Sequence, residues 1–376
     1  MKPRVYFTSN VFTPSEIGSN DKISQKVRHK IKQLWETLCN DAEVKLFKDR
    51  FPSEAQLQQD IQKFNPNLIG CHLSHKISSK IQEKANIFAV CTSSAGYDHI
   101  QKTQKDDIII THTPGILHET VADYTIALIM TNLRNIIDLH NCVWNNQWSI
   151  QDKWDLDQDL SSIISNKILG IIGLGEIGKE LVKKLYSWNL KILYHDIKRM
   201  EQFEKMYPNI IFKERIEDLI KESDIISVHI PLNNNTEKFI NRDLLKIMKE
   251  DALLINTARG QIIDFDALLD LLETRKIRIN LAFDVFPIEP IDSATLIRIK
   301  NIKMQQPDIR IILMPHNASA DAETRGKMNI MFLEDIIKLI ESKGLEDLKE
   351  IHLIPEQKNE ILKKNWKIYT YWNKNL

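Results

Sequence analysis

The stretch that decides the fold is Ile168-Leu-Gly-Ile-Ile-Gly173-Leu-Gly175-Glu-Ile-Gly178-Lys-Glu-Leu181, a GxGxxG sequence between an apolar run and a helical pattern. Its three spaced glycines have separate uses. Gly173 permits a tight turn, Gly175 lets the backbone approach a pyrophosphate, and Gly178 lets helix and strand pack closely. The chain holds only 11 glycines, yet four of them fall between residues 170 and 178. The pattern therefore predicts a dinucleotide-binding turn between a strand and a helix.

A carboxylate suited to the coenzyme's ribose follows the next strand-like run. Asp196 stands eighteen residues after the last of these glycines. An acid at this place accepts hydrogen bonds from the ribose hydroxyls and repels a 2′-phosphate, so the sequence favours NAD over NADP as the cofactor. Lys198 and Arg199 follow closely and weaken that preference. Glu176 and Ile177 begin the helix, whose N-terminal N–H groups are expected to face the phosphates.

Length and composition exclude several classes of protein. A chain of 376 residues is too long for one ordinary core and predicts two domains. Lys+Arg and Asp+Glu both number 51, so no basic excess indicates a nucleic-acid partner. The uncharged stretch Tyr124–Leu133 covers ten residues, too few to cross a bilayer. No signal-peptide core follows Met1, and four scattered cysteines suit neither a disulfide framework nor a metal site. We therefore expect a cytoplasmic protein with no metal and no membrane or nucleic-acid partner.

Short apolar or β-branched runs alternate with amphipathic stretches along most of the chain, which predicts parallel sheets built from right-handed βαβ crossovers. The expected strands are residues 4–8, 44–47, 68–72, 88–92 and 108–111 in a first series, then 168–172, 191–194, 225–229, 252–256, 279–282 and 309–314 in a second. A helical pattern runs from Thr120 to Leu139 as one expected helix, and another runs from Asp321 to Ser342. The sequence thus predicts two α/β domains in series.

Three residues at or near strand ends of the second series carry groups suited to hydride chemistry. Arg259 directly follows an apolar strand, Glu289 lies in a proline-stiffened loop, and His316 follows the last strand. Each one alone is more often an ordinary surface or structural residue. Together they supply a carboxylate clamp, a general acid or base that works near neutral pH, and a carboxylate to orient it. That is the set of groups that a 2-oxo acid reductase needs.

With these residues in place, the chain resembles the D-isomer-specific 2-hydroxyacid dehydrogenases, most closely the glyoxylate/hydroxypyruvate reductase and phosphoglycerate dehydrogenase branches. The resemblance runs from about Arg4 to Gly344. The motifs that carry it are Ser94-Ala95-Gly96-Tyr97-Asp98, Thr113-Pro-Gly-Ile-Leu-His-Glu-Thr-Val-Ala-Asp123, the glycine loop, His229-Ile-Pro231-Leu, Asn256-Thr-Ala-Arg-Gly260, Asp284-Val-Phe-x-x-Glu289-Pro and Pro315-His316-x-Ala-Ser319.

The resemblance implies a role for each matching residue. Arg259 would bind the carboxylate and carbonyl of the substrate, His316 would be the acid/base, and Glu289 would be its partner. The backbone at Ala95 and Gly96 would hold the substrate carboxylate. Four further residues would line the coenzyme: Thr257, Ala258 and Asp284 on the nicotinamide side, and Pro231 on the adenosine side.

The resemblance also implies an α/β architecture of two Rossmann-like, doubly wound parallel-sheet domains. A discontinuous flavodoxin-like substrate domain would comprise residues 1–112 and 317–350, with an NAD-binding Rossmann domain, residues 113–316, inserted into it. The helix and arm at 120–166, with Trp144, Trp148 and Trp154, match the region through which relatives form homodimers, although these tryptophans could equally pack within one subunit. Residues 351–376 form a C-terminal extension unlike the family's short C-terminus.

Several departures and alternatives bear on function. Asn317 replaces a small apolar residue, and Lys300–Asp308 adds residues that we expect in a loop. Formate dehydrogenases have Gln at the position of Glu289, and phosphite dehydrogenases have Lys at the position of Ala95. The residues present here therefore disfavour both of these activities. A binding scaffold that senses NADH, as the C-terminal-binding-protein corepressors do, is the alternative to an enzyme. The absence of a long disordered tail argues against such a scaffold. Among substrates of an enzyme, the sequence does not choose between the glyoxylate, hydroxypyruvate and 3-phosphoglycerate types.

Overall fold

The computed structural model describes residues 2–83, 86–149, 156–361 and 363–375. The chain folds into two compact units, residues 1–117 with 320–376, and residues 118–319. The domain boundaries expected at residues 112 and 316 lie a few residues before these. No helix within the described ranges combines the length and apolar character needed to cross a membrane.

The first unit contains a five-stranded, wholly parallel sheet in the order β2-β1-β3-β4-β5. This is the doubly wound order of flavodoxin-like sheets, as the sequence predicted. Its strands are β1 (Arg4–Phe7), β2 (Glu43–Leu46), β3 (Leu68–Cys71), β4 (Ala89–Thr92) and β5 (Ile109–Thr111). Its helices are α1 (Gln25–Asp41), α2 (Glu54–Phe64), α3 (Ser79–Glu83), α12 (Ala322–Glu341), α13 (Pro355–Lys358) and α14 (Ile368–Asn375).

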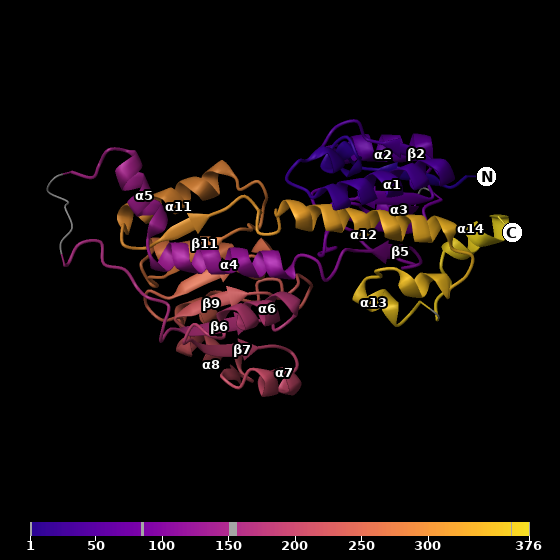
Figure 1. Ribbon diagram of the computed structural model, residues 1–376. Coiled ribbons are helices and arrows are strands. Elements are labelled where there is room, and N and C mark those ends of the chain that lie inside the picture. The colour runs from indigo at the N-terminus through magenta and orange to yellow at the C-terminus, as the bar shows by residue number, and fades with distance from the viewer. Residues whose placement is uncertain (1, 84–85, 150–155, 362, 376) are drawn as a thin grey trace. The chain divides into compact units, whose positions relative to one another are not determined.

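Alternation along β1 explains why helices cover both faces of this sheet. Val5 and Phe7 belong to one apolar cluster with residues of α1 and α12, whereas Tyr6 belongs to another with residues of α2. The helices α1 and α12 lie side by side, although some 300 residues separate their starts (Figure 1). The first unit is therefore completed by chain that follows the second unit.

The last residues of the chain belong to the core of the first unit. Trp366 is 1% exposed, Ile368 and Trp372 are also buried, and all three lie in the same cluster as Val5 and Phe7. Residues 351–376, which are rich in Lys and Asn, were set apart as an extension because they are unlike the short C-terminus of the family. The structure shows that the aromatic and aliphatic residues among them pack as ordinary core.

The second unit contains a seven-stranded parallel sheet in the order β12-β11-β10-β9-β6-β7-β8, a Rossmann order with a seventh strand added. Its strands are β6 (Ile168–Ile172), β7 (Lys191–His195), β8 (Ile210–Phe212), β9 (Ile225–Val228), β10 (Leu253–Asn256), β11 (Asn280–Phe283) and β12 (Ile311–Leu313). Its helices are α4 (His118–Leu133), α5 (Ile136–Trp144), α6 (Glu176–Leu185), α7 (Glu201–Met206), α8 (Ile216–Glu222), α9 (Arg242–Lys246), α10 (Phe265–Glu273) and α11 (Ser293–Gln305).

Three expectations within this unit were wrong. The strand β8 was missed, because three residues at a sheet edge give too short a pattern. The single helix expected over residues 120–139 is two helices, α4 and α5, separated at Asn135, whose φ of +51° lies in the left-handed region. Asn tolerates that conformation better than most residues and so allows the break. The loop expected over Lys300–Asp308 is helical as far as Gln305, at the end of α11.

Candidate active site

The glycine loop lies at the carboxyl end of β6 and depends on two close backbone approaches. Gly173 has φ +94°, and a Cβ there would lie 2.7 Å from the carbonyl oxygen of His229. A Cβ on Gly178 would lie 2.3 Å from the carbonyl oxygen of Gly173. By contrast, an ideal Cβ on Gly175 would meet no atom within 4 Å. The first glycine lets the loop pass against the chain after β9, the last brings α6 against the loop, and the middle glycine leaves open space above the backbone.

The Asp196 carboxylate lies beside this loop, immediately after β7. Its Oδ2 accepts a hydrogen bond from the backbone N–H of Leu174 at 2.7 Å. A carboxylate has further acceptor capacity, so this bond leaves Asp196 able to accept from a ribose hydroxyl. The guanidinium of Arg199 is paired with Glu204, with Nη2 and Oε2 2.8 Å apart. Of the two cations that follow Asp196, Arg199 is therefore already matched by a carboxylate.

These residues fit a dinucleotide. The strands β7, β6 and β9 are neighbours in the sheet, and their carboxyl ends present Asp196, the glycine loop and the segment that holds Pro231 at one edge. The N-terminus of α6, where Glu176 and Ile177 begin the helix, carries no side-chain cap. Its N–H groups and the space over Gly175 suit a pyrophosphate.

A turn closed by the side chain of Asn256 holds Arg259 at the end of β10. The side chain of Asn256 accepts a hydrogen bond from Ala258 N at 3.0 Å and donates one to Arg259 O at 2.8 Å. Thr257 and Ala258 lie inside this turn, and Arg259 Nη1 donates to Ala258 O at 2.8 Å. Asn256 was not singled out from the sequence, although Asn at a strand end commonly closes such turns.

His316 and Glu289 are in direct contact, although 27 residues separate them. His316 Nδ1 lies 2.7 Å from Glu289 Oε2, while Glu289 Oε1 accepts from Phe286 N at 3.0 Å. Because a carboxylate accepts hydrogen bonds, we assign the hydrogen to Nδ1 of His316. This leaves Nε2 as the ring nitrogen that can exchange a proton with a substrate.

The pKa of Glu289 lies below its ordinary value. Burial alone would raise this pKa, but the hydrogen bonds from His316 and from Phe286 N lower it, as do the charges of His316 and Arg259. The Glu289 carboxylate is therefore ionised at neutral pH.

Asp284 fixes the turn that carries His316. It is fully buried at the end of β11, and its carboxylate accepts from Asn317 N at 2.7 Å and from Ala318 N at 2.8 Å. Its backbone carbonyl accepts from His316 N at 2.8 Å. Burial raises the pKa of Asp284, and the two amide bonds oppose that rise. This supporting contact was not foreseen, because the residues it joins lie more than 30 positions apart.

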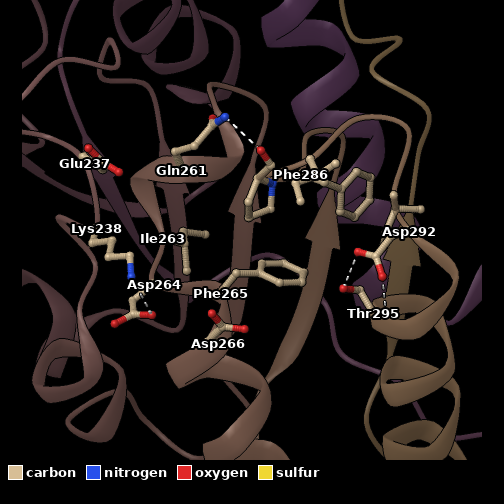
Figure 2. Close-up of a pocket in the computed structure, with 13 residues that line it drawn as sticks. Glu237, Lys238, Gln261, Ile263, Asp264, Phe265, Asp266, Phe286, Asp292 and Thr295 are labelled. Atoms are coloured by element: carbon tan, nitrogen blue, oxygen red, sulfur yellow. Dashed lines mark hydrogen bonds and ion pairs between the residues drawn. The ribbon is translucent and has the colours of Figure 1, made fainter.

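The Arg259 turn and the Glu289 loop pack directly on each other. A Cβ on Gly260 would lie 1.9 Å from the carbonyl carbon of Phe286, so only glycine permits this approach. Next to it, Gln261 Nε2 donates to Pro287 O at 2.9 Å, beside a pocket of about 230 Å³ (Figure 2). The chain contains few glycines, and this scarcity was the sequence signal that could have identified Gly260 as a position where a side chain is not tolerated.

The expected carboxylate-binding turn belongs to the first unit, where Ala95 and Gly96 follow β4. Ser94 Oγ donates to Gly96 O at 2.7 Å and so closes the turn. Within the described part of the chain, neither Ala95 N nor Gly96 N donates a hydrogen bond. The turn therefore presents two backbone N–H groups that are available to an anion.

Comparisons with known proteins give one consistent result. Residues 126–318 match the family described as D-isomer specific 2-hydroxyacid dehydrogenase, NAD binding domain. The chain is 35% identical to a glyoxylate reductase of Thermofilum pendens over 306 residues, 80% of this chain and 86% of that relative. It is 31% identical to a glyoxylate reductase of Korarchaeum cryptofilum over 341 residues, 90% of this chain and 92% of that relative.

A solved structure shares the fold. The NADPH-dependent glyoxylate/hydroxypyruvate reductase of Sinorhizobium meliloti, in complex with NADP and malonate, superposes with a TM-score of 0.73 at 21% identity. The match covers 95% of this chain and 98% of that chain. At this identity the likeness shows the fold alone, and the fold does not choose between NAD and NADP.

The open space above Gly175 gives a prediction. Gly175→Ala should leave the free energy of unfolding within about 1 kcal/mol of wild type, because the added methyl group meets no atom and the backbone there is extended. The same methyl group would obstruct a pyrophosphate, so the Kd for the coenzyme should rise tenfold or more. Denaturation and fluorescence titration with NADH measure the two effects.

Gly344→Ala is the matched control, because a Cβ there also meets no atom within 4 Å. It should change neither stability nor coenzyme affinity. Coenzyme binding that survives Gly175→Ala unchanged would place the pyrophosphate elsewhere.

Proposed function

The chain belongs to the D-isomer-specific 2-hydroxyacid dehydrogenase family, and we propose that it uses NADH to reduce a small 2-oxo acid of the glyoxylate, hydroxypyruvate or phosphohydroxypyruvate type. Family membership makes it an oxidoreductase that interconverts 2-oxo and 2-hydroxy acids with a nicotinamide coenzyme. The observation that carries the proposal is the 2.7 Å contact of His316 with an ionised Glu289. The tight packing of the Arg259 turn against the Glu289 loop supports it.

The proposed chemistry assigns one task to each group. Arg259 binds the substrate carboxylate and polarises the carbonyl, and the N–H groups of Ala95 and Gly96 bind the carboxylate. His316, protonated at Nε2, gives that proton to the carbonyl oxygen as negative charge develops there. Glu289 keeps the imidazole oriented and places a negative charge beside it. When bound, the coenzyme supplies the hydride.

The chain's own residues favour NADH over NADPH. The carboxylate of Asp196 would lie against a 2′-phosphate and repel it. Arg199, the residue best suited to bind such a phosphate, is already paired with Glu204. Thr257 and Ala258 would line the nicotinamide side of the coenzyme, and Pro231 the adenosine side. Asp284, expected on the nicotinamide side as well, is fully buried and would support that side from beneath.

A second copy of the chain is the proposed partner of the exposed helix α5. No residue of α5 is buried, and Ile136, Val143 and Trp144 are 49%, 59% and 78% exposed. Trp148 continues this apolar surface at 61%, whereas Trp154 lies outside the described residues. Apolar surface of this kind marks a protein interface. Light scattering should therefore give about twice the mass of one chain, and a monomer would contradict the proposal.

The thiols suit the reducing cytoplasm that we propose as the location. Cys71 and Cys91 lie on the neighbouring strands β3 and β4, and both are fully buried free thiols that form no disulfide. Cys39 and Cys142 are also free. Reduced thiols are typical of proteins kept in a reducing compartment.

A scaffold that binds NADH without turnover receives no support from the comparisons, since both of the relatives described above are named as reductases. The two classes differ in one measurement. An enzyme oxidises NADH when a 2-oxo acid is supplied, whereas a scaffold binds NADH and leaves it unchanged.

The central prediction concerns turnover and choice of coenzyme. Following absorbance at ~340 nm with a panel of 2-oxo acids should show oxidation of NADH by at least one of them. The kcat/KM with NADH should exceed that with NADPH tenfold or more, a difference on the order of 1.4 kcal/mol. Asp196→Ala should narrow this gap by removing the repelling charge. No turnover with any acid would refute the enzyme, and equal use of NADPH would refute the role of Asp196.

A second prediction concerns the pH dependence. The pKa of Glu289 is lowered, so its carboxylate is charged at neutral pH. Glu289→Gln removes that charge and keeps a side chain of similar size beside Nδ1 of His316. A negative charge favours a nearby cation, so the falling limb of the pH–rate profile for reduction, which requires a proton on the imidazole, should move to lower pH. Oxidation of the hydroxy acid requires the neutral ring and should extend to more acidic pH.

Glu273→Gln is the control for this experiment. Glu273 is a carboxylate of the same unit whose pKa is also lowered, chiefly by its hydrogen bond with Arg298. Its loss should leave both limbs in place. A Glu289→Gln variant that loses activity equally at every pH would show that the carboxylate only orients His316.

A further inference from the structure

The C-terminal segment 352–357 covers the outer edge of β5, which would otherwise be the open edge of the sheet of the first unit (Figure 1). His112 N donates to His352 O at 3.0 Å, and Ile354 N donates to Ile110 O at 3.1 Å. Thr111 and Leu353 form an antiparallel bridge between these bonds. The chain thus returns to the sheet more than 200 residues after leaving it.

Gln357 fixes the register of this pairing. Its side chain is 1% exposed, donates to Ile108 O and accepts from Ile110 N, both at 2.8 Å. Trp366 and Ile368, fully buried beyond it, hold the chain that follows. The segment is therefore anchored on both sides of Glu356 and has little freedom to slide.

A first connection runs from this edge to the carboxylate-binding turn through His112. The His112 ring is 7% exposed, and its Nδ1 lies 2.8 Å from Ala95 O. A carbonyl oxygen only accepts hydrogen bonds, so Nδ1 carries the hydrogen. Burial lowers the pKa of His112, which keeps the ring neutral. The backbone bond from His112 to His352 fixes the base of this side chain.

A second connection runs through Tyr97, the residue directly after Gly96. Its hydroxyl donates to Glu356 Oε2 at 2.9 Å, and its ring meets the ring of His112 edge to face at 5.4 Å. Burial and the bond to Glu356 raise the pKa of Tyr97, so the hydroxyl remains a donor. The turn is thus linked to the C-terminal segment twice, through the side chain of Tyr97 and through His112, whose backbone N–H bonds to His352 O.

We propose that the C-terminal segment positions the Ala95–Gly96 turn for substrate, with His112, Tyr97 and Glu356 as the positioning residues. The inference rests on the proposed function, which assigns this turn to the carboxylate of the 2-oxo acid. Hydrogen bonds to an anion weaken steeply when the N–H groups point away from it. The Ser94 side chain closes the turn from within, and the contacts of His112 and Tyr97 support it from outside.

The test compares variants of the full-length chain. His112→Phe keeps the ring but loses the bond to Ala95 O, whereas His112→Asn places an amide nitrogen near the position of Nδ1. We expect His112→Phe to raise the KM for the 2-oxo acid about tenfold, with kcat and the Kd for NADH within twofold of wild type. His112→Asn should restore most of the loss.

The second connection is tested with a double-mutant cycle. Tyr97→Phe and Glu356→Ala should each raise the same KM several-fold, and the double variant should be no worse than either single one. Both changes are at partly exposed positions, so they remain informative if His112→Phe fails to fold. Glu360→Ala, which removes a carboxylate paired with Lys364 just beyond this segment, is the control and should change nothing.

A binding measurement separates this inference from the proposed function. Calorimetry with oxamate, a carboxylate that cannot be reduced, should show the same tenfold weakening in the NADH complex of His112→Phe. If wild type binds oxamate but reduces no 2-oxo acid, the proposed function fails, and the oxamate affinities of the variants still decide the inference. Unchanged affinities, equal losses in kcat and NADH binding, or no binding of oxamate to wild type would each overturn it.

Discussion

At the end of β11, a fully buried carboxylate accepts the N–H groups of two successive residues, Asn317 and Ala318. A carboxylate without partners in this position would cost several kcal/mol, so Asp284 and the two amides depend on one another. His316, which precedes them, has φ +54°, a conformation that few side-chain-bearing residues adopt without outside support. The same carboxylate therefore sets the direction of the imidazole, and its contact with Glu289 follows from that direction.

Close backbone contact supplies the other half of this arrangement. The Glu289 loop lies on the Arg259 turn because Gly260 has no side chain, and the amide of Gln261 ties the two together. The strand ends determine the approximate positions of Arg259 and His316, whereas these contacts fix the final placement of their side chains. Catalytic groups need that accuracy, because a displacement of about 1 Å can reduce a rate by two orders of magnitude.

The sequence predicted those features of the fold that depend on local patterns of residues. Two parallel sheets and the glycine loop follow from short apolar runs and from glycines at Gly173 and Gly178, where any side chain would collide with the backbone, whereas the strand orders were implied only by resemblance to the family. The pairing of Glu289 with His316 was expected from the complementary chemistry of the two groups and from resemblance, because no local pattern relates residues 27 positions apart. The supporting roles of Asp284 and Gly260, the break at Asn135 and the burial of Trp366 depend on tertiary contacts that have no sequence period.

The return of the chain to β5 joins stability and substrate binding in the first unit. An edge strand of three residues presents unpaired backbone groups that invite association with other chains, and the C-terminal segment satisfies them. Its bonds at His352 and Ile354 fix the strand from which His112 reaches Ala95 O. Because the same hydrogen bonds close the edge and support the turn, loosening the C-terminal segment would weaken both together. The glycine loop and Asp196 belong to the other unit and share none of these bonds, so coenzyme affinity would be left intact.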